Sequence, residues 1–546
     1  MAAGIFLSRI TGLIRDRVFA HYFGNADAAD AFKAAQKIPN FLQNLLGEGV
    51  LSASFIPVYA RLLATGERAS ATGGQASATG GRASCPPSEA GSPGDQTARE
   101  SATADRVASA IGSLLAVSVS FIVALGVLLT PYFVDLVAPG FTGDKRELTI
   151  RLVRILFPGV GLLVMSAWCL GILNSHRRFF LSYVSPVLSN AAMIAAMIAW
   201  GWGGRHDQNT LVQITAWSLV AGNLLQFAVQ LPTVWRLVPQ LRPVLDTSSS
   251  HIRTIIRNFG PVVLARGVVQ VSAYIDNIIA SFLPMGAVAS LGYAQTLYLL
   301  PVSLFGMSVS AAELPAMSGA SGSSEEIAAH LHKRLDAGLR QIAFFIIPSA
   351  AAFLAFGDVV VGAIYQTGQF TRHDTRYVWT VLAGFTLGLP AMTFGRLYAS
   401  TFYALRDTRT PLNFALVHVA IATVLGYLFA LRLPGLLGID PRWGAAALTA
   451  SAAFAGWIEF VLLRRSLNAR IGHTGLSAPY AAQLCLAALA AVLAGSAGRL
   501  LHIQPPLLAA LVTLVPFGLA YLIMTTLLRI PEAQAVLGRF MRKTPR

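Results

Sequence analysis

Apolar residues fill the chain in long runs that short polar links separate. A helix needs about 20 apolar residues to cross the hydrocarbon core of a bilayer, and runs of this length recur along the whole sequence. The pattern predicts an all-α, polytopic membrane protein. We predict about fourteen transmembrane helices, at residues 5–23, 31–63, 107–129, 152–173, 183–202, 211–235, 255–283, 287–317, 339–361, 377–403, 411–431, 445–463, 480–501 and 506–528.

The first predicted span is unusual because charged residues interrupt its apolar sequence. Arg9, Arg15 and Asp16 fall within one arc of a helix together with Gly12, whereas Arg17 points elsewhere. A charge at membrane depth costs at least ~2.5–3.5 kcal/mol, so it persists where it faces water, a partner or a substrate. An interfacial helix with a basic face would explain the bases alone. The acid among them favours a cationic site for an anionic ligand inside a helix bundle.

The second predicted span contains signals for a broken helix. Pro39 and Pro57 remove backbone donors, and Gly47, Glu48 and Gly49 lie between them. Irregular backbone at membrane depth is tolerated where it lines a cavity or is buried in protein. The following residues, 66–104, are rich in Ala, Ser, Thr, Gly and Pro and lack apolar periodicity, which predicts a disordered cytoplasmic loop.

Composition agrees with the membrane assignment and adds an orientation. Only 12% of the 546 residues are charged, whereas a soluble protein carries about 25%. If the N-terminus is cytoplasmic, about twice as many Lys and Arg residues lie on the cytoplasmic side as on the external side, as the positive-inside rule expects. We therefore predict that both termini are cytoplasmic and that the net charge of +16 reflects topology rather than nucleic-acid binding.

The sequence shows no pattern of catalytic or metal-binding residues. The 3 cysteines are widely separated and the 10 histidines form no ligand cluster. No nucleophile–base set and no glycine-rich phosphate loop is visible. We predict a protein that is not an enzyme and has no cofactor.

Charged and polar residues also occur within later spans. Arg266 and Gln270 share one stripe of the seventh predicted span, and Glu313 lies near the end of the eighth. A structural ion pair between Arg266 and Glu313 is one explanation. Arginines from two halves of a bundle would also suit a phosphate or diphosphate, which they bind through charge-assisted hydrogen bonds. Asp16 could hold the arginines when the site is empty, or titrate or bind a cation during transport.

Several motifs resemble one known family, the MurJ/MviN lipid II flippases of the multidrug/oligosaccharidyl-lipid/polysaccharide exporter superfamily. The resemblance is most specific at the N-terminus and continues in order along nearly the whole chain. The motifs are Ser8-Arg9-x-x-Gly12-x-x-Arg15-Asp16, Phe23-Gly24, Ala29-Asp30-Ala31-Phe32, Lys37-Ile38-Pro39-Asn40, Glu48-Gly49, Ser52-x-x-Phe55-Ile56-Pro57, Ala138-Pro139-Gly140-Phe141, Gly260-Pro261 with Gln270, and Asp407-Thr408-x-Thr410-Pro411.

The resemblance implies two pseudo-symmetric six-helix bundles around a cationic cavity. On this basis we expect an N-terminal bundle at 1–236, a C-terminal bundle at 250–470 and a cytoplasmic tail at 531–546. It further implies that the last two helices, within 475–530, form a groove for a lipid tail. From the residues alone, a lipid-facing pair packed on the bundle is the default interpretation of these two helices.

The resemblance also implies the function. We expect a monomeric flippase that moves lipid II, an undecaprenyl-diphosphate-linked peptidoglycan precursor, from the cytoplasmic to the outer leaflet of the inner membrane by alternating access. Coupling to a monovalent cation or to the membrane potential is possible. We assign substrate contacts to Arg9, Arg15, Asp16, Asp30, Asn40, Glu48, Arg266 and Gln270.

The chain departs from the family pattern at two expected arginines. Gln43 and Thr296 stand at these positions, and we hypothesise that Arg266 restores a cation with Glu313 as its partner. The sequence also begins close to Arg9, which suggests that a short amphipathic lead is absent or that the start is misassigned. The departures leave three alternatives open: a flippase for another polyprenyl-diphosphate-linked glycan, a cation-coupled small-molecule exporter of the same fold, and a non-transporting membrane scaffold.

Overall fold

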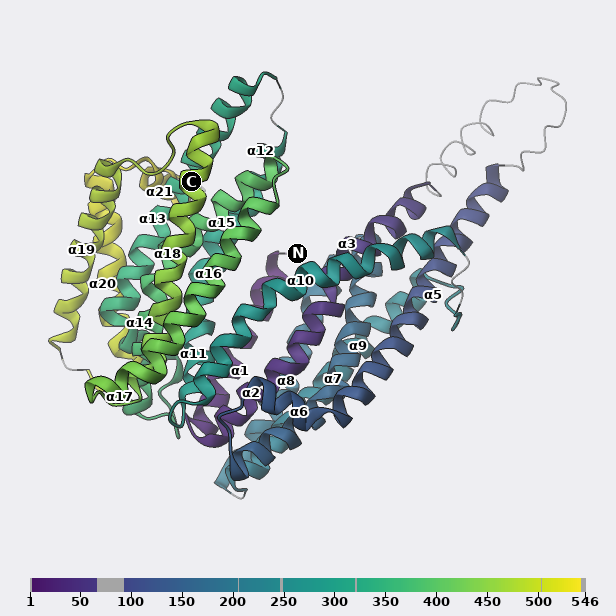
Figure 1. The fold of residues 1–546 in the computed structure, drawn as a ribbon, viewed down its shortest axis with the longest axis horizontal. Coiled ribbons are helices and arrows are strands. Elements are labelled where there is room, and N and C mark those ends of the chain that lie inside the picture. Colours follow the sequence, from purple (N-terminus) through teal and green to yellow (C-terminus); the bar gives the residue numbers. More distant parts are fainter. Residues whose placement is uncertain are drawn as a thin grey trace. The chain divides into compact units, whose positions relative to one another are not determined.

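The computed structural model describes residues 2–65, 93–204, 206–245, 249–319, 322–501 and 503–541 (Figure 1). Within these ranges the side chains of residues 2–6, 48, 52–53, 93–101, 251, 258, 260–262, 264–273, 536–537 and 539–541 are not described. The regular elements of the described residues are all helices. The early ones are α1 (Ala2–Phe23), α2 (Asp27–Leu46), α3 (Glu48–Ser54), α5 (Pro93–Leu128), α6 (Thr130–Val137), α7 (Gly143–Ser175), α8 (Phe179–Gly201), η1 (Trp202–Gly204), α9 (Gln208–Leu237) and α10 (Ser250–Ser281).

The later elements continue the all-helical pattern. They are α11 (Ala287–Pro301), η2 (Val302–Met307), α12 (Ser308–Ser318), α13 (Ser324–Tyr365), α14 (Arg372–Leu387), α15 (Leu389–Ala404), α16 (Arg409–Tyr427), η3 (Leu428–Arg432), α17 (Leu433–Leu437), α18 (Trp443–Ile471), α19 (Ala478–Arg499), α20 (Pro506–Leu527) and α21 (Pro531–Met541).

The predicted all-α membrane fold is confirmed, but the count of fourteen spans is not. Among the described residues, 10 helices are long and apolar enough to cross a membrane, or 11 if α14 and α15, bent by 41° at Gly388, form one span. Three predicted spans are not among them, namely those that correspond to α1, α2 with α3, and α10. Each carries several charged residues, and these lower the mean hydropathy of a helix.

The chain divides into two compact units. The first comprises Met1–Phe19 and Ala31–Tyr274, and the second comprises Ala20–Asp30 and Ile275–Arg546. This division differs from the predicted boundary between 236 and 250 in two ways. It falls inside α10, and it assigns the turn between α1 and α2 to the second unit.

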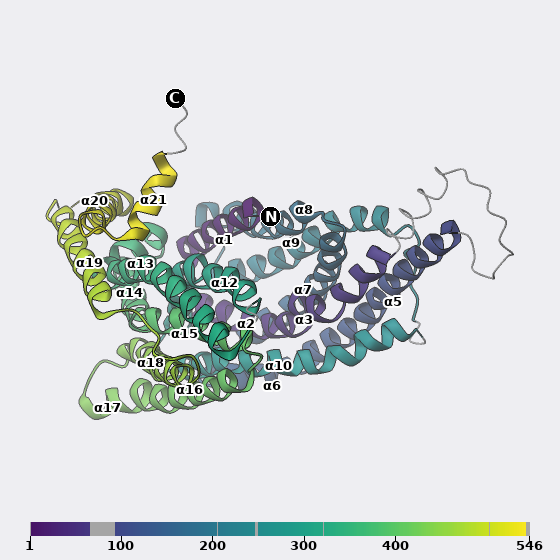
Figure 2. The same ribbon diagram turned by 90° about the horizontal axis from the view of Figure 1, so that it is seen from above.

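The first unit is built around α7. This helix packs against α5 and α9, and α8 packs along α9 (Figures 1 and 2). Its core includes Val160, Val164 and Trp168, all nearly without solvent contact. Trp168 donates its indole N–H to the carbonyl oxygen of Ala108 on α5 at 3.2 Å. This hydrogen bond satisfies the polar atom of a large buried side chain and fixes α7 against α5.

The linker after α9 is held along α5 by a regular set of hydrogen bonds. Successive residues of an extended segment point to opposite sides, so every second backbone N–H faces the same helix. Polar side chains one turn apart on α5 lie on one face and accept these N–H groups. The bonds run from Gln240 to Asp105 at 3.3 Å, from Arg242 to Ser109 at 3.3 Å and from Val244 to Ser113 at 3.0 Å.

The second unit is organised around α13, which has 42 residues. It packs against α14, α15, α19 and α20, while α16 packs along α18 (Figure 1). Tyr521 on α20 donates its hydroxyl to the carbonyl oxygen of Phe344 on α13 at 2.7 Å. The last two predicted spans therefore pack together and against α13.

The second predicted span is broken, but not at Pro39. Pro39 lies inside α2, which continues to Leu46. The break is at Gly47, whose N–H donates to the carbonyl oxygen of Gln43 at 2.7 Å. A Cβ at Gly47 would lie 2.4 Å from that oxygen, so only glycine fits this turn.

The predicted disordered loop at 66–104 requires a correction at its C-terminal end. Residues 66–92 lie outside the described part of the chain, but α5 begins at Pro93 and continues to Leu128. Proline is favoured in the first turn of a helix, and the Ala, Glu and Arg residues that follow are good helix formers. Ala104 is fully buried in the core of the first unit, so tertiary packing also stabilises this segment.

Candidate functional site

The first unit contains a buried carboxylate that two cations share. Asp16 on α1 is 3% exposed. Its Oδ1 accepts hydrogen bonds from Arg15 at 2.9 Å and 3.2 Å, through Nη2 and Nε. The Nζ of Lys33, on α2, lies 3.6 Å from the same oxygen. One carboxylate thus faces two positive charges.

Asn190 on α8 completes this cluster. Arg15 donates through Nη1 to Asn190 Oδ1 at 3.0 Å, and Asn190 donates through Nδ2 to Thr11 Oγ1 at 3.3 Å. Gly12 faces the Asn190 amide, which would lie 4.0 Å from a Cβ at that position. The amide therefore links α1 to α8. It also gives the Arg15 guanidinium a second hydrogen-bond acceptor besides Asp16.

Lys33 is placed by aromatic packing as well as by charge. Its ammonium lies 5.1 Å from the centroid of the Phe19 ring, and the Phe19 and Phe32 rings are 5.0 Å apart. A cation over an aromatic face gains electrostatic attraction, and more so where water is excluded. Only 13% of the Lys33 side chain is exposed. The lysine is therefore held beside Asp16 with little access to water.

The charges of this cluster are of a kind that suits an anion. Arg15 and Lys33 contribute two positive charges and Asp16 one negative charge, so the three together are cationic. The Arg15 side chain is 28% exposed and is the most accessible of the three. A guanidinium with a planar fork of donors suits a phosphate oxygen pair. An incoming phosphate would replace Asp16 as the partner of the cations.

The structure brings together only part of the predicted site. Arg15 and Asp16 are in contact, whereas Arg9 and Asn40 are exposed. The side chains of Glu48, Arg266 and Gln270 lie outside the described residues. Their assignment to the substrate site, and the hypothesis that Arg266 pairs with Glu313, therefore stay predictions. In this structure Glu313 lies 3.6 Å from Arg334 on α13.

Asp30 has a clear structural partner that the sequence did not indicate. It belongs to the second unit and is 1% exposed. Its two carboxylate oxygens accept the backbone N–H groups of Gly286 at 2.8 Å and Ala289 at 2.7 Å, at the first turn of α11. A carboxylate at a helix N-terminus satisfies unpaired N–H groups and complements the helix dipole. Asp30 acts here as a cap of α11.

Sequence reasoning missed two members of the cluster, Lys33 and Asn190, as site residues. A signal existed for each, since a lysine in a predicted membrane span and an asparagine in another are both costly in hydrocarbon. Neither could be paired with Asp16 from the sequence, because Asn190 is 175 residues from Arg15. Within the described residues, no group of three or more His, Cys, Asp or Glu side chains is arranged to hold a metal ion.

Two apolar cavities lie in the second unit. The first, which we call the α13–α20 groove, has a volume of about 510 Å³ and is open to one side. Phe344, Pro348 and Phe353 of α13 form one wall, and Leu514, Phe517 and Gly518 of α20 form another. Apolar walls of this kind suit a hydrocarbon chain rather than a charged headgroup.

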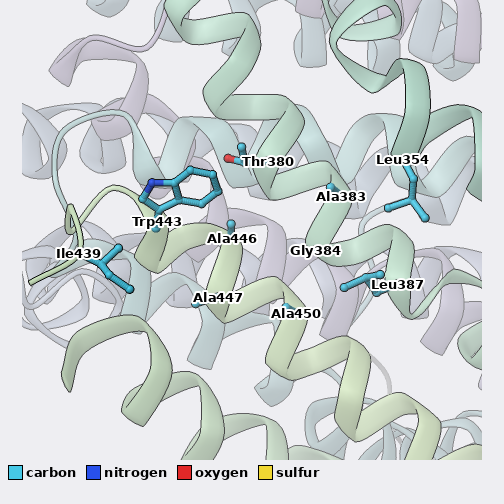
Figure 3. Close-up of a pocket in the computed structure, with 10 residues that line it drawn as sticks. All are labelled: Leu354, Thr380, Ala383, Gly384, Leu387, Ile439, Trp443, Ala446, Ala447 and Ala450. Atoms are coloured by element: carbon cyan, nitrogen blue, oxygen red, sulfur yellow. The ribbon is translucent and has the colours of Figure 1, made fainter. Parts of the chain in front are cut away.

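The second cavity is also apolar and lies between α13, α14 and α18 (Figure 3). Its volume is about 400 Å³. Among its lining residues, only Thr380 and Trp443 carry polar side-chain atoms, and the small side chains of Ala383, Ala446 and Ala450 leave it open. This cavity contains none of the predicted site residues and offers no charge to bind an anion.

Solved structures with a similar fold are membrane transporters. A structure described as lipid II flippase MurJ in an inward closed conformation matches 96% of this chain and 98% of its own, with a TM-score of 0.74 and 22% identity. An inward-facing multidrug resistance MATE family transporter of the MOP superfamily matches 85% of this chain and 95% of its own, with a TM-score of 0.62 and 17% identity. These likenesses show the fold.

Sequence comparisons show the family. A probable lipid II flippase MurJ of Rhizobium meliloti is 28% identical over 501 residues, which cover 90% of this chain and 83% of the relative. A lipid II flippase MurJ of Burkholderia cenocepacia is 29% identical over 85% of this chain and 82% of its own. The family model described as lipid II flippase MurJ matches residues 19–514, a range that includes Lys33 and Asn190. The chain thus belongs to the MurJ family of lipid II flippases.

Proposed function

We propose that this protein is an inner-membrane flippase that carries lipid II from the cytoplasmic to the outer leaflet by alternating access. Membership of the MurJ family carries the proposal, and the Asp16 cluster supports it chemically. Lipid II presents a diphosphate, and diphosphates bind to arginine and lysine through charge-assisted hydrogen bonds. The protein lowers the barrier to moving a charged headgroup through hydrocarbon, and no bond of the substrate is broken.

Asp16 gives the site a means of releasing its substrate. With the site empty, Asp16 neutralises part of the charge of Arg15 and Lys33. A bound diphosphate takes over these partners, and Asp16 competes for them again when the site opens to the other side. We propose substrate contacts for Arg15 and Lys33, with Asn190 holding the guanidinium in position.

The α13–α20 groove supports a place for the polyprenyl tail. A long tail that remained in water would cost about 0.8 kcal/mol for each exposed CH₂ group. The groove offers phenylalanine, leucine and proline walls within the second unit. We propose that part of the tail lies there while the headgroup crosses the membrane.

The proposal also covers the orientation of the chain in the membrane, its oligomeric state and the source of energy for transport. The excess of Lys and Arg in one set of loops supports cytoplasmic termini, and we propose that the protein acts as a monomer. The membrane potential is worth ~2.3 kcal/mol for each charge moved through 100 mV, so export of an anion toward a positive exterior is favoured electrically. A coupling cation would add to this driving force.

Complementation of a bacterial strain depleted of its own lipid II flippase tests the function. The wild-type chain should restore growth, and Arg15→Ala and Lys33→Ala should fail to do so at equal expression. Arg151→Ala is a matched control, because Arg151 is an exposed arginine that pairs with Glu147 one turn away on its own helix. This variant should grow like the wild type.

The outcomes separate lipid II from other cargo. Growth with the wild type and death with both cluster variants supports lipid II transport through the Asp16 cluster. Growth with all variants would reject the cluster as the headgroup site. Failure of a well-expressed wild type would favour another polyprenyl-diphosphate-linked glycan, which the replacement of two expected arginines by Gln43 and Thr296 would then explain.

A further inference from the structure

The apolar cavity between α13, α14 and α18 is short compared with the thickness of a membrane. Along α14 it extends from Thr380 to Leu387 (Figure 3). At 1.5 Å per residue, this is a length of about 10 Å that begins about 12 Å from Arg372, the first residue of the helix. Along α18 the cavity begins at Trp443, the first residue, and reaches Ala450. One leaflet contributes about 15 Å of hydrocarbon, so the cavity fits within a single leaflet.

Small residues bring α14 and α18 together and leave the cavity beside their contact. A Cβ at Gly384 of α14 would lie 2.7 Å from the carbonyl oxygen of Ala446 on α18, so the two backbones approach closely. The alanines next to this contact are too short to fill the space beside it (Figure 3). Leu354, Leu387 and Trp443 line the cavity and are themselves exposed. The cavity is therefore open on one side, where a bilayer would supply hydrocarbon chains.

Basic side chains flank the end of the cavity that is nearest the start of α14. Arg442 directly precedes Trp443, and its Nη1 donates to Nε2 of His373 on α14 at 3.0 Å. Arg376 lies three residues after His373 and four before Thr380, so it shares a face of α14 with both. Arg376 is exposed, and its side chain has no hydrogen bond or ion pair with the residues that the structure describes. Two arginines thus lie at one edge of the cavity, which we call the basic edge.

The acids at the basic edge accept backbone N–H groups. Asp374 accepts the N–H of Thr371 at 2.8 Å in the capping box of α14. Asp440 accepts the N–H of Arg442 at 2.9 Å. An imidazole has no negative charge, so its contact with His373 holds Arg442 without neutralising it. The arginines in the first turn of α14, in its second turn and before α18 outnumber the two acids; they are Arg372, Arg376 and Arg442.

Two further acids near these helices have partners of their own. Asp358 of α13 forms an ion pair with Arg499 on α19. Asp30, whose charge interacts with the Tyr377 phenol of α14, accepts two N–H groups at the start of α11. The basic edge therefore keeps a net positive charge beside an apolar cavity.

We propose that this cavity binds one acyl chain of an anionic membrane phospholipid, whose phosphate contacts Arg376 and Arg442. A phosphate accepts charge-assisted hydrogen bonds from guanidinium groups, and the chain joined to it is apolar like the cavity. A free phosphate would leave the cavity unfilled. A polyprenyl tail of 55 carbons is much longer than this cavity, which matches part of one acyl chain. This inference concerns a lipid other than the transported one and does not rest on the proposed function.

The fluorescence of Trp443 can report an acyl chain in the cavity, because bromine atoms on a chain quench a tryptophan that they contact. The full-length protein is placed in phosphatidylcholine vesicles that contain a variable fraction of brominated phosphatidylglycerol or brominated phosphatidylcholine. The signal of Trp443 is the part that Trp443→Phe lacks. We expect half-quenching at a mole fraction of brominated phosphatidylglycerol about tenfold or more below that of brominated phosphatidylcholine, because each arginine near an anionic lipid contributes about fivefold.

Trp217 provides a control for general contact with lipid. It is an exposed tryptophan of α9, a candidate span of the first unit, and its signal is obtained in the same way from Trp217→Phe. Trp217 should be quenched to a similar extent by both brominated lipids. Equal half-quenching of Trp443 by the two lipids would overturn the proposal.

Variants of the basic edge and of the cavity separate the two parts of the site. Arg376→Gln and Arg442→Gln should each lower the preference for phosphatidylglycerol at Trp443 about fivefold, and Arg151→Gln, an exposed arginine of α7, should keep it. Ala450→Leu fills part of the cavity and should reduce quenching of Trp443 by phosphatidylglycerol, with the thermal midpoint checking that the variant is folded. A preference that persists in the double arginine variant would place the phosphate elsewhere and overturn the assignment.

Competition with unlabelled lipid II tests the other possible occupant. Lipid II should not restore the Trp443 fluorescence when its mole fraction is below that of brominated phosphatidylglycerol. Recovery under this condition would assign the cavity to the polyprenyl lipid, and the phospholipid proposal would be wrong. The quenching measurements do not require transport. Failure of lipid II transport would therefore reject the proposed function and leave the assignment of this cavity to be decided by the quenching alone.

Discussion

Asp16 is the residue on which the candidate site depends, because it is the shared counter-charge of Arg15 and Lys33. A buried carboxylate between two cations lowers the cost of burying each of them, since an unpaired charge in a protein interior is strongly unfavourable. On the proposed function, the same carboxylate competes with the anionic headgroup for these cations. Removal of this carboxylate should therefore strengthen binding of the ligand and slow its transport.

Replacement of Asp16 by Asn tests this competition. Binding of a water-soluble diphosphate-linked sugar should become about tenfold tighter, because one charge-assisted hydrogen bond no longer competes for the cations. Transport should fall, because the headgroup is released more slowly. Binding can be measured by calorimetry and transport in vesicles. Asp135→Asn is the control, since Asp135 forms an exposed ion pair with Arg146. Weaker binding by Asp16→Asn would show that Asp16 supports the ligand rather than competing with it.

Asp30 differs from Asp16 because its carboxylate accepts backbone N–H groups at the start of a helix instead of pairing with cations. We predict that Asp30→Ala lowers the free energy of unfolding by about 2 kcal/mol or more, because two charge-assisted hydrogen bonds to the first turn of α11 are lost. The measurement is the denaturant or thermal midpoint of the purified protein. Asp27→Ala, an exposed acid one turn earlier, should change stability much less. Unaltered stability with loss of substrate binding would instead assign Asp30 to the substrate site.

At the residue scale, the sequence could indicate Arg15 and Asp16 because charge within an apolar run is visible locally. It could not show that Asp30 caps a helix 256 residues away, because such a partner depends on tertiary packing. The same limit applies to Lys33 and Asn190. Local spacing defines which residues are unusual, and only the fold defines which of them meet.

At the element scale, the start of α16 is stabilised by an acid in the preceding turn. Asp407 accepts the backbone N–H of Thr410 at 3.0 Å and its hydroxyl at 2.7 Å, and it pairs with Arg470 at 2.7 Å. The hydrogen bonds from Thr410, together with Arg470, hold the pKa of Asp407 well below its usual range. This acid lies between α15 and α16, outside the candidate spans.

The lowered pKa of Asp407 predicts a pH dependence of stability. In the unfolded chain an aspartate titrates near pH ~3.9, so the stabilisation is fully present above that value and is lost as the pH falls toward the lower folded pKa. We expect Asp407→Asn to be less stable than the wild type at pH 7, and the difference in melting temperature to shrink below about pH 4. Thermal unfolding across this range measures it, with the exposed Asp440→Asn as control. A difference that stays constant with pH would contradict the expected linkage.

Element boundaries follow from the sequence where local chemistry decides them. The second predicted span is interrupted as expected, but the break is at Gly47 rather than at Pro39, which is accommodated inside α2. The start of α5 at Pro93 was not predicted, because a segment rich in Ser, Thr and Gly precedes it and conceals the helix formers. The prediction that charged helices such as α1 are spans stays unconfirmed, since α1 is not among the candidate membrane spans of the described residues.

At the scale of the whole molecule, the all-α membrane fold was predictable because bilayer thickness fixes the length of apolar helices. The division into units was not, because it depends on long-range packing. Residues Ala20–Asp30 show why, since they are continuous with α1 and α2 but pack within the second unit. There the hydroxyl of Tyr293 donates to the carbonyl oxygen of Gly24 at 2.9 Å.

The α13–α20 groove leads to a prediction about substrate length. Gly518 lines the groove, and a Cβ at this position would meet open space, so a larger side chain can enter it without displacing the backbone. Gly518→Trp should fill part of the groove with the protein still folded. If the polyprenyl tail lies there, transport of full-length lipid II should fall about tenfold or more, which corresponds to losing the burial of two or more CH₂ groups. A lipid II analogue with a short prenyl chain has fewer CH₂ groups to bury in the groove, so this variant should transport it at nearly the wild-type rate.

A matched control separates filling of the groove from the general effect of an added tryptophan. Gly435 in α17 also has open space at its Cβ, and it lies outside the residues that line the groove. Gly435→Trp should transport both lipids like the wild type. Equal loss of both lipids by Gly518→Trp would mean that the substitution disturbs the headgroup path or the folding of α20. Equal retention of both would place the tail in the surrounding bilayer, and the last two helices would then be a lipid-facing pair.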